Sequence, residues 1–175
     1  AVFGSLGPLS TEEQAAGLQA LGRLCPFVDL TRVGIWGWSG GGSMTLNMLL
    51  RYPDLYGTGV SVAPVPDQHL YDAIYQERYM GLPEDNREGY ALGSPVTFAG
   101  NLRGNLLVIH GTGDDNVHYQ GTERMINALV AANRQFSMFA YPNRSHGISE
   151  GTNTTRHLFT MITGYFLSHM PPGGR

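Results

Sequence analysis

The chain contains one cysteine, Cys25, in 175 residues. A single thiol excludes an internal disulfide framework and a cysteine-based zinc site, although it does not fix the redox compartment. Charged residues make up only 14% of the chain, the net charge is −3 and there is no basic block. This charge balance argues against nucleic acid or an anionic membrane surface as a partner. No stretch approaches the ~18 apolar residues of a membrane-spanning helix, so none is predicted in this chain.

What is present fits one globular unit. The length suits a single domain, and 42% hydrophobic residues can supply a core. We find no repeat, linker or internal boundary, so residues 1–175 are treated as one domain. The tail 171–175 is expected to be irregular.

Short apolar runs alternate with amphipathic segments along the chain. The expected strands cover residues 32–38, 57–63, 105–111 and 135–141. Helices are expected over residues 10–24, 43–52, about 70–79, 120–133 and 154–170. The first of them should open at a capping box in which Ser10 caps and Glu13 lies three residues on. The alternation predicts an α/β fold with a parallel sheet and right-handed crossovers.

Three loops that follow expected strands carry residues of catalytic type. They read "GWSGGG", "GTGDDNVH" and "PNRSHG". Loops at the carboxyl ends of parallel strands share one edge of the sheet, which is where ligands bind in such folds. Ser39, one aspartate of the 114–115 pair and His146 are therefore expected to converge there.

The segment Gly37–Gly41, "GWSGG", matches the G-x-S-x-G turn between a strand and a helix. In that turn the serine sits in a strained conformation with its hydroxyl exposed, and small residues two before and two after it avoid clashes. Gly37 and Gly41 fill these places. The amide of Gly40, at the start of the helix, is well placed to hold a developing oxyanion.

The glycines alone also allow a purely structural turn, because such turns are common between strands and helices. A P-loop fits poorly because no lysine follows the glycines. A dinucleotide-binding turn fits poorly because the spacing differs from G-x-G-x-x-G and no acidic strand end follows at the required distance.

A serine nucleophile needs a base, and the base needs an orienting acid. The chain order serine, aspartate, histidine matches the α/β-hydrolases. His146, in a loop between the last strand and the last helix, is the best base, whereas His110 ends an apolar strand and is expected to be a buried hydrogen-bonding residue. Spacing does not separate Asp114 from Asp115. The histidines show no metal-ligand spacing, so we expect neither a metal nor a cofactor.

Four segments, "IWGWSGGG", "ERYMGLPEDN", "HGTGDDNVHYQ" and "RSHGI", resemble the dipeptidyl peptidase IV branch of the prolyl oligopeptidase family of serine peptidases. The resemblance runs from about Ser10 to the last helix. It implies Ser39 as the nucleophile, Asp114 as the acid, His146 as the base and the Gly40 N–H as an oxyanion donor. It also implies a peptidase that releases Xaa-Pro or Xaa-Ala dipeptides through an acyl-enzyme, with an esterase or acylaminoacyl peptidase of the same fold as the alternative.

The resemblance also implies a substrate pocket that accepts proline. Its residues would be Val65, Tyr71, Tyr75, Asn116 and Val117, and ordinary core packing is the alternative for the apolar ones. Two positions depart from the family pattern, which usually has tyrosine after the serine and a tryptophan in the pocket wall. Here these positions hold Gly40 and Gln68.

Relatives of this branch carry an N-terminal β-propeller and earlier hydrolase strands, and no segment of the chain resembles either. The resemblance therefore implies the C-terminal portion of an α/β-hydrolase domain from a larger parent, which would be periplasmic or extracellular. The alternative of another class is that the portion alone is an inactive fragment or an interaction domain. Without the earlier strands, residues 32–38 would form an apolar edge, so we expect self-association into a dimer or larger.

Overall fold

The computed structural model describes residues 3–170, so the tail 171–175 expected to be irregular lies outside the described residues. Its elements, where η marks a 3₁₀ helix, are α1 (Pro8–Leu24), β1 (Gly34–Trp38), α2 (Gly40–Arg51), β2 (Thr58–Val62), η1 (Gln68–Leu70), α3 (Ala73–Met80), α4 (Arg87–Gly93), η2 (Pro95–Asn101), β3 (Asn105–Gly111), α5 (Tyr119–Ala131), β4 (Ser137–Tyr141) and α6 (Thr154–His169). The four strands lie within the segments predicted for them.

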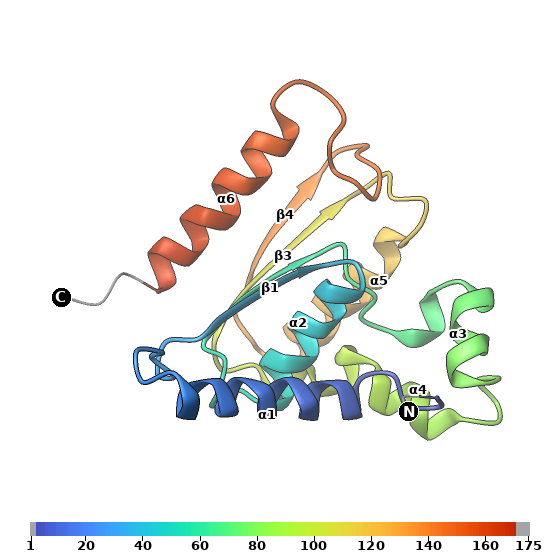
Figure 1. Cartoon of the computed structure of the whole chain (residues 1–175). Coiled ribbons are helices and arrows are strands. Elements are labelled where there is room, and N and C mark those ends of the chain that lie inside the picture. Colours follow the sequence, from blue (N-terminus) through green and yellow to red (C-terminus); the bar gives the residue numbers. More distant parts are fainter. Residues whose placement is uncertain (1–2, 171–175) are drawn as a thin grey trace.

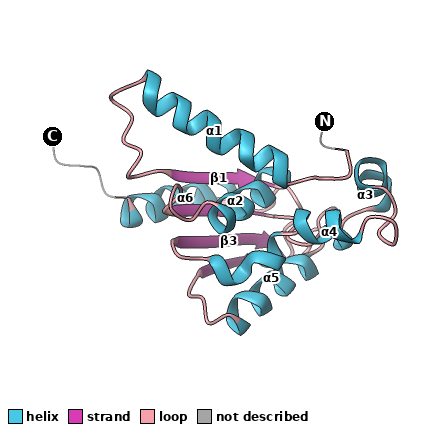
Figure 2. Cartoon of the chain, turned by 90° about the horizontal axis from the view of Figure 1, so that it is seen from below, coloured by secondary structure: helices cyan, strands magenta, loops and turns pink. Residues whose placement is uncertain are grey.

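The strands form one parallel sheet in the order β1-β2-β3-β4, which is also their order in the chain (Figure 2). Trp38 pairs with Val62, and Val62 with Ile109, so the ends of β1, β2 and β3 are in register. The predicted parallel α/β sheet is confirmed. The loops after β1, β3 and β4 consequently leave the sheet at one edge.

Helices cover both faces of the sheet, with α6 on one face and α1, α2 and α5 on the other (Figure 1). Consecutive residues of β3 point to opposite faces: Leu106 and Val108 belong to the core under α2 and α5, whereas Leu107 and Ile109 pack against α6. This period of two, with both faces buried, is typical of a strand inside a three-layer α/β/α structure.

Strand β1 lies at the edge of the sheet. Among residues 3–170 it pairs only with β2, and its Trp36 side chain is 49% exposed. Every residue of β2 is buried, in contrast. An apolar strand edge of this kind is open to pairing with another chain.

The predicted start of the first helix is wrong. The helix begins at Pro8 after Gly7, and neither residue supplies a side-chain cap. Ser10 lies inside the first turn, where its hydroxyl donates to the Gly7 carbonyl, and so does that of Thr11. Proline at the first helical position has its φ preset and needs no N–H partner, which lets the helix start earlier than the capping box indicated.

The segment between β2 and β3 is more regular than predicted. The helix expected over residues 70–79 is present as α3, but α4 and η2 were not predicted. The Asn86 side chain caps α4 by accepting from the Gly89 N–H, and it also donates to the carbonyls of Gly4 and Met80. These bonds hold α3 and α4 against the N-terminal segment.

Candidate active site

Ser39 occupies the sharp turn between β1 and α2. Its φ of 59° and ψ of −120° lie outside the regions that a residue with a side chain prefers. Its N–H donates to the Val62 carbonyl at 2.8 Å, which fixes the turn to the end of β2. Strain of this kind persists only where the surroundings hold it, and it is concentrated at functional sites. Helix α2 starts at the next residue, so free amide groups surround the serine.

The glycines around Ser39 serve different purposes. A Cβ on Gly37 would lie 2.2 Å from the Gly41 carbonyl oxygen, and one on Gly42 would lie 2.5 Å from the Val62 carbonyl oxygen. A Cβ on Gly41 or on Gly40 would meet nothing within 4 Å. The predicted steric need is therefore correct for Gly37 and wrong for Gly41. Gly42, which was not singled out, is the second glycine that close packing requires.

Asp114 and His146 are joined across the two loops that carry them. His146 Nδ1 lies 2.7 Å from Asp114 Oδ2, and the other carboxylate oxygen accepts the N–H groups of Asn116 and Val117 at 3.0 and 2.8 Å. The Asp114 side chain is fully buried, whereas Asp115 is exposed. Of the two aspartates that spacing left open, Asp114 is therefore the one that contacts His146.

Two further hydrogen bonds join the loop of Asp114 to the loop of His146. The Gly113 N–H donates to the Arg144 carbonyl at 3.1 Å, and the Asn143 N–H donates to the Thr112 hydroxyl at 2.9 Å. A Cβ on Gly111 would lie 2.2 Å from the Arg144 carbonyl oxygen. The glycines of "HGTG" therefore let the loop that carries Asp114 approach the loop that carries His146.

His110 lies behind the carboxylate and is fully buried, as predicted. Its Nε2 lies 3.1 Å from Asp114 Oδ2 and 2.9 Å from the Val117 carbonyl, and its Nδ1 lies 2.7 Å from the Thr122 hydroxyl. Both Nε2 partners are acceptors, so the proton is assigned to Nε2 and Nδ1 accepts from Thr122. Asp114 Oδ2 thus receives hydrogen bonds from two histidines.

These contacts set the protonation states. Burial lowers the pKa of His110 against the pull of Asp114, which keeps the ring neutral. Burial alone would raise the pKa of Asp114, but the hydrogen bonds from His146 and from the N–H groups of Val117 and Asn116 outweigh it, and the pKa is lowered. Asp114 is therefore a carboxylate at neutral pH, able to hold His146 with its proton on Nδ1.

The free energy of unfolding is expected to fall in two stages as the pH is lowered from 7. Below the unfolded-state pKa of histidine, ~6.5, the unfolded chain takes up a proton that buried His110 does not. Below ~3.9, the contribution of Asp114 is lost in the same way. Urea unfolding across this range measures both stages. His110→Gln, which cannot titrate, should flatten the first stage, and a wild-type stability unchanged between pH 7 and 4.5 would contradict the prediction.

A contact that the sequence did not indicate ties the base to the serine turn. The indole N–H of Trp38, the residue before Ser39, donates to the His146 carbonyl at 2.9 Å. Among the hydrogen bonds of residues 3–170, none joins the Ser39 and His146 side chains, which is common before substrate binds. The Trp38 bond links the serine turn to the loop of His146 without that contact.

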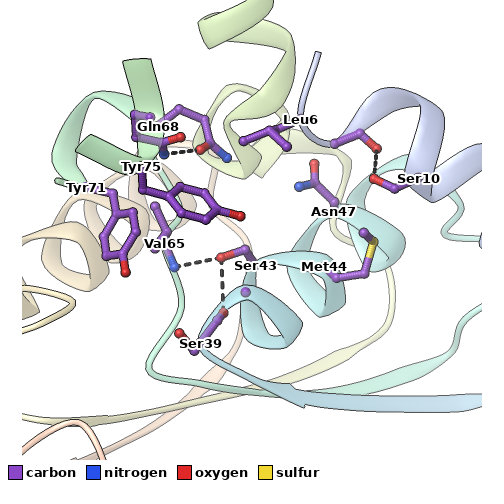
Figure 3. Close-up of a pocket in the computed structure, with 13 residues that line it drawn as sticks. Leu6, Ser10, Ser39, Ser43, Met44, Asn47, Val65, Gln68, Tyr71 and Tyr75 are labelled. Carbon is purple, nitrogen blue, oxygen red and sulfur yellow. Dashed lines mark hydrogen bonds between the residues drawn. The ribbon is translucent and has the colours of Figure 1, made fainter. Parts of the chain in front are cut away.

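A cavity of about 290 Å³ opens beside Ser39 and Gly40. Of the residues predicted for a substrate pocket, Val65, Tyr71 and Tyr75 line it, and they lie together on one side of Ser39 in Figure 3. Gln68 also lines the cavity. Asn116 contacts it indirectly, because its Oδ1 accepts from the Tyr71 hydroxyl at 3.1 Å. Val117 is buried and is not among the residues that line the cavity.

Ser43 is a further residue of the site that the sequence did not indicate. Its hydroxyl donates to the Ser39 carbonyl at 3.2 Å and accepts the Val65 N–H at 2.7 Å (Figure 3). It therefore connects the nucleophile turn to the wall of the cavity. Helical spacing from Ser39 is the only signal in the sequence that would have suggested it, since positions four apart share a face.

Residues 3–170 contain no group of three or more metal-ligating side chains. None of the helices there has the length and apolarity needed to cross a bilayer.

The family model for the prolyl oligopeptidase family matches residues 2–172. The chain belongs to this family. The match covers the elements that carry Ser39, Asp114 and His146, as the resemblance of the four segments predicted.

Known members of the prolyl oligopeptidase family show the same likeness in sequence and structure. Dipeptidyl-aminopeptidase B of Uncinocarpus reesii is 45% identical over 82% of the chain and 16% of its own length, and dipeptidyl peptidase 4 of Bos taurus is 37% identical over 91% and 21%. The crystal structure of Porphyromonas gingivalis dipeptidyl peptidase 4 superposes with a TM-score of 0.91 and 42% identity, over 96% of this chain and 24% of that one. The four-stranded sheet and its helices thus match part of the α/β-hydrolase fold, and the chain spans about a fifth of the length of these relatives.

Proposed function

We propose that the chain is the C-terminal part of the catalytic domain of a larger serine peptidase, which releases N-terminal Xaa-Pro or Xaa-Ala dipeptides. The observation that carries this proposal is the bond of 2.7 Å between His146 Nδ1 and Asp114 Oδ2. With the Trp38 bond beside it, this contact supports a serine triad built from three loops at one edge of the sheet. The names of the two relatives described above support the dipeptidyl preference.

In the proposed reaction, the Ser39 hydroxyl attacks the scissile carbonyl while its proton moves to His146 Nε2. The Gly40 N–H stabilises the oxygen that becomes negative. His146 then gives the proton to the departing amine, which leaves an acyl-enzyme on Ser39. Water attacks the ester, His146 takes the water proton, and the dipeptide leaves as Ser39 regains its proton. Asp114 keeps the imidazole in the required tautomer throughout.

The cavity wall suits a small rigid residue at P1, the position whose carbonyl is attacked. Val65 and the rings of Tyr71 and Tyr75 offer an apolar surface, and the two rings meet edge to face at 5.5 Å between centroids. We assign Asn116, held by the Tyr71 hydroxyl, to the substrate carbonyl, and Val117 to the packing behind it. Recognition of the substrate's free amine and the second oxyanion donor would come from other parts of the parent.

A fluorophosphonate probe tests the triad directly, because it reacts only with an activated serine. In the complete polypeptide that carries this chain, Ser39 should be labelled and the labelling should disappear in His146→Ala, which removes the base. His169→Ala, exposed in the last turn of α6, is the matched control and should retain labelling. A folded polypeptide without labelling would overturn the proposal and favour a non-catalytic interaction domain.

Chromogenic substrates separate the peptidase from an esterase or acylaminoacyl peptidase. The proposal expects dipeptide-linked substrates with proline or alanine at P1 to have a higher kcat/KM than simple acyl substrates or acetylated amino acids. The reverse order would assign the site to the alternative activity.

We further propose that the isolated chain associates with itself through the exposed edge of β1. Sedimentation velocity at high concentration should show a dimer or larger species. Trp36→Glu, which puts a charge on that edge, should shift it to a monomer, whereas Phe27→Glu, at a site 86% exposed before β1, should not. A stable wild-type monomer at high concentration contradicts this.

A further inference from the structure

The cavity beside Ser39 does not end at the tyrosines. It continues past Gly40 into a second region, here called the inner lobe, which is lined by Leu6, Gly7, Ser10, Met44 and Asn47. In Figure 3 the labelled residues of this lobe lie on the opposite side of Ser43 from Tyr71, Tyr75 and Val65. The lobe therefore lies between α2 and the start of α1, away from the pocket assigned to proline.

The passage into the inner lobe runs beside Gly40. A Cβ at this position would meet nothing within 4 Å, so the space beside it is open. Asn47 follows Ser39 by eight residues, a rise of about 12 Å along the helix at 1.5 Å per residue. Because helical side chains lean toward the N-terminus, the Asn47 amide closes part of that separation. A long P1 side chain is needed to bridge the rest.

Asn47 gives the lobe a specific chemistry. The residue is only 2% exposed, and its Oδ1 accepts from Arg51 Nε at 3.0 Å. Arginine can only donate, so this bond fixes which end of the amide is oxygen. The Nδ2 group donates to no residue among 3–170, and Figure 3 shows the Asn47 amide in the cavity between Leu6 and Ser43. A buried amide with two unused donors in a cavity favours a ligand that brings an acceptor.

The charges around the inner lobe favour a ligand that carries a hydrogen-bond acceptor. None of the residues that line the cavity is acidic. Arg51, bonded to the far side of the Asn47 amide, is held with its guanidinium 4.1 Å from the centroid of the Phe98 ring. Its positive charge polarises the amide and strengthens donation from Nδ2.

We propose that the site also accepts a long, unbranched P1 side chain ending in an acceptor oxygen, as in glutamine or glutamate, which Asn47 binds in the inner lobe. This rests on the proposed peptidase function and extends its substrate range beyond proline and alanine. The apolar stem would pass between Gly40 and Tyr75 and along Met44, and the terminal oxygen would accept from Asn47 Nδ2. Asn47 is then a residue that determines specificity.

The test compares Xaa-Gln, Xaa-Glu, Xaa-norleucine and Xaa-Pro substrates with the complete polypeptide that carries this chain. Norleucine matches the length of glutamine but lacks its acceptor. The wild type should cleave the glutamine substrate with a kcat/KM at least roughly fivefold above norleucine, the effect of one hydrogen bond. Asn47→Asp keeps the acceptor for Arg51 but removes both donors, so this ratio should fall to 1 or below. In this variant, the kcat/KM of the glutamate substrate should fall further than that of the glutamine substrate, because the introduced carboxylate repels that of glutamate.

Two further variants control the test. Asn101→Asp adds the same charge at an exposed position at the end of η2 and should leave the ratio of glutamine to norleucine at its wild-type value. Ser10→Leu fills the lobe from α1. It should lower the kcat/KM of the glutamine and norleucine substrates together, relative to that of the proline substrate. Cleavage of Xaa-Pro without cleavage of Xaa-Gln, or an unchanged ratio in folded Asn47→Asp, overturns this inference and leaves the proposed function standing. Failure to cleave any substrate, with no labelling of Ser39, overturns both.

Discussion

Replacing Asp114 with asparagine is expected to lower kcat by on the order of 10⁴, the loss found when the aspartate of a serine triad becomes an amide. The carboxylate accepts from His146 Nδ1 at 2.7 Å. An asparagine that kept its oxygen toward the N–H groups of Asn116 and Val117 would present its NH₂ to the imidazole instead. The ring would then carry its proton on Nε2, where the base must accept one.

The same change is expected to destabilise the fold, because His110 donates to the same carboxylate oxygen at 3.1 Å. The new NH₂ would face the buried Nε2–H and leave a donor opposite a donor. A buried polar group without its partner costs about 1–3 kcal/mol. Asp114→Asn should therefore lower both kcat and the free energy of unfolding.

The measurement pairs kcat, from the complete polypeptide that carries this chain, with the free energy of unfolding from urea titration. Asp115→Asn is the matched control, since the neighbouring carboxylate is exposed, and it should change neither quantity appreciably. If Asp115→Asn lost the activity and Asp114→Asn kept it, the assignment of the acid would be reversed.

Replacing Gly37 with alanine is expected to prevent the serine turn from forming in its present shape. The added methyl group would lie 2.2 Å from the Gly41 carbonyl oxygen and 2.3 Å from the carbonyl carbon. Both obstacles are backbone atoms of α2, so relief requires β1 and α2 to separate. Overpacking of this kind typically costs 1–3 kcal/mol or more, a large part of the stability of a domain this size. Gly42→Ala should act similarly, through the Val62 carbonyl.

Gly41→Ala separates steric need from helix propensity. Its methyl group meets nothing within 4 Å, and alanine is favoured over glycine in a helix by about 0.5–1 kcal/mol. Thermal unfolding should thus place Gly37→Ala and Gly42→Ala well below the wild type, and Gly41→Ala at or above it. Equal destabilisation by all three would show that the glycines act as flexible residues rather than as clearance.

The parts of the fold that the sequence predicted are those with strong periodicity. The run at residues 105–111 gave the clearest signal of a buried strand, and the strand-turn-helix pattern around Ser39 located the turn. Convergence of Ser39, one aspartate of the 114–115 pair and His146 at one edge was predicted from the parallel sheet alone. Alternating short strands and helices leave few other topologies open.

The parts that were missed depend on contacts between segments far apart in the chain. Asn86 caps α4 while holding Gly4, some 80 residues away, and no local pattern marks such a bond. The first helix starts early because Pro8 tolerates a position that a capping serine would otherwise mark. Spacing does not distinguish Asp114 from Asp115. Only Asp114 turns inward, where its carboxylate contacts His110 and His146.

The identical order of the strands in the sheet and in the chain bears on how the molecule is made. During synthesis, each strand after β1 therefore emerges after the strand with which it pairs. The segment that forms the serine turn, between β1 and α2, is thus synthesised before β4, which precedes His146. Under the proposed function, a nascent chain that has not yet reached β4 carries Ser39 without His146, and so has the proposed nucleophile without its base.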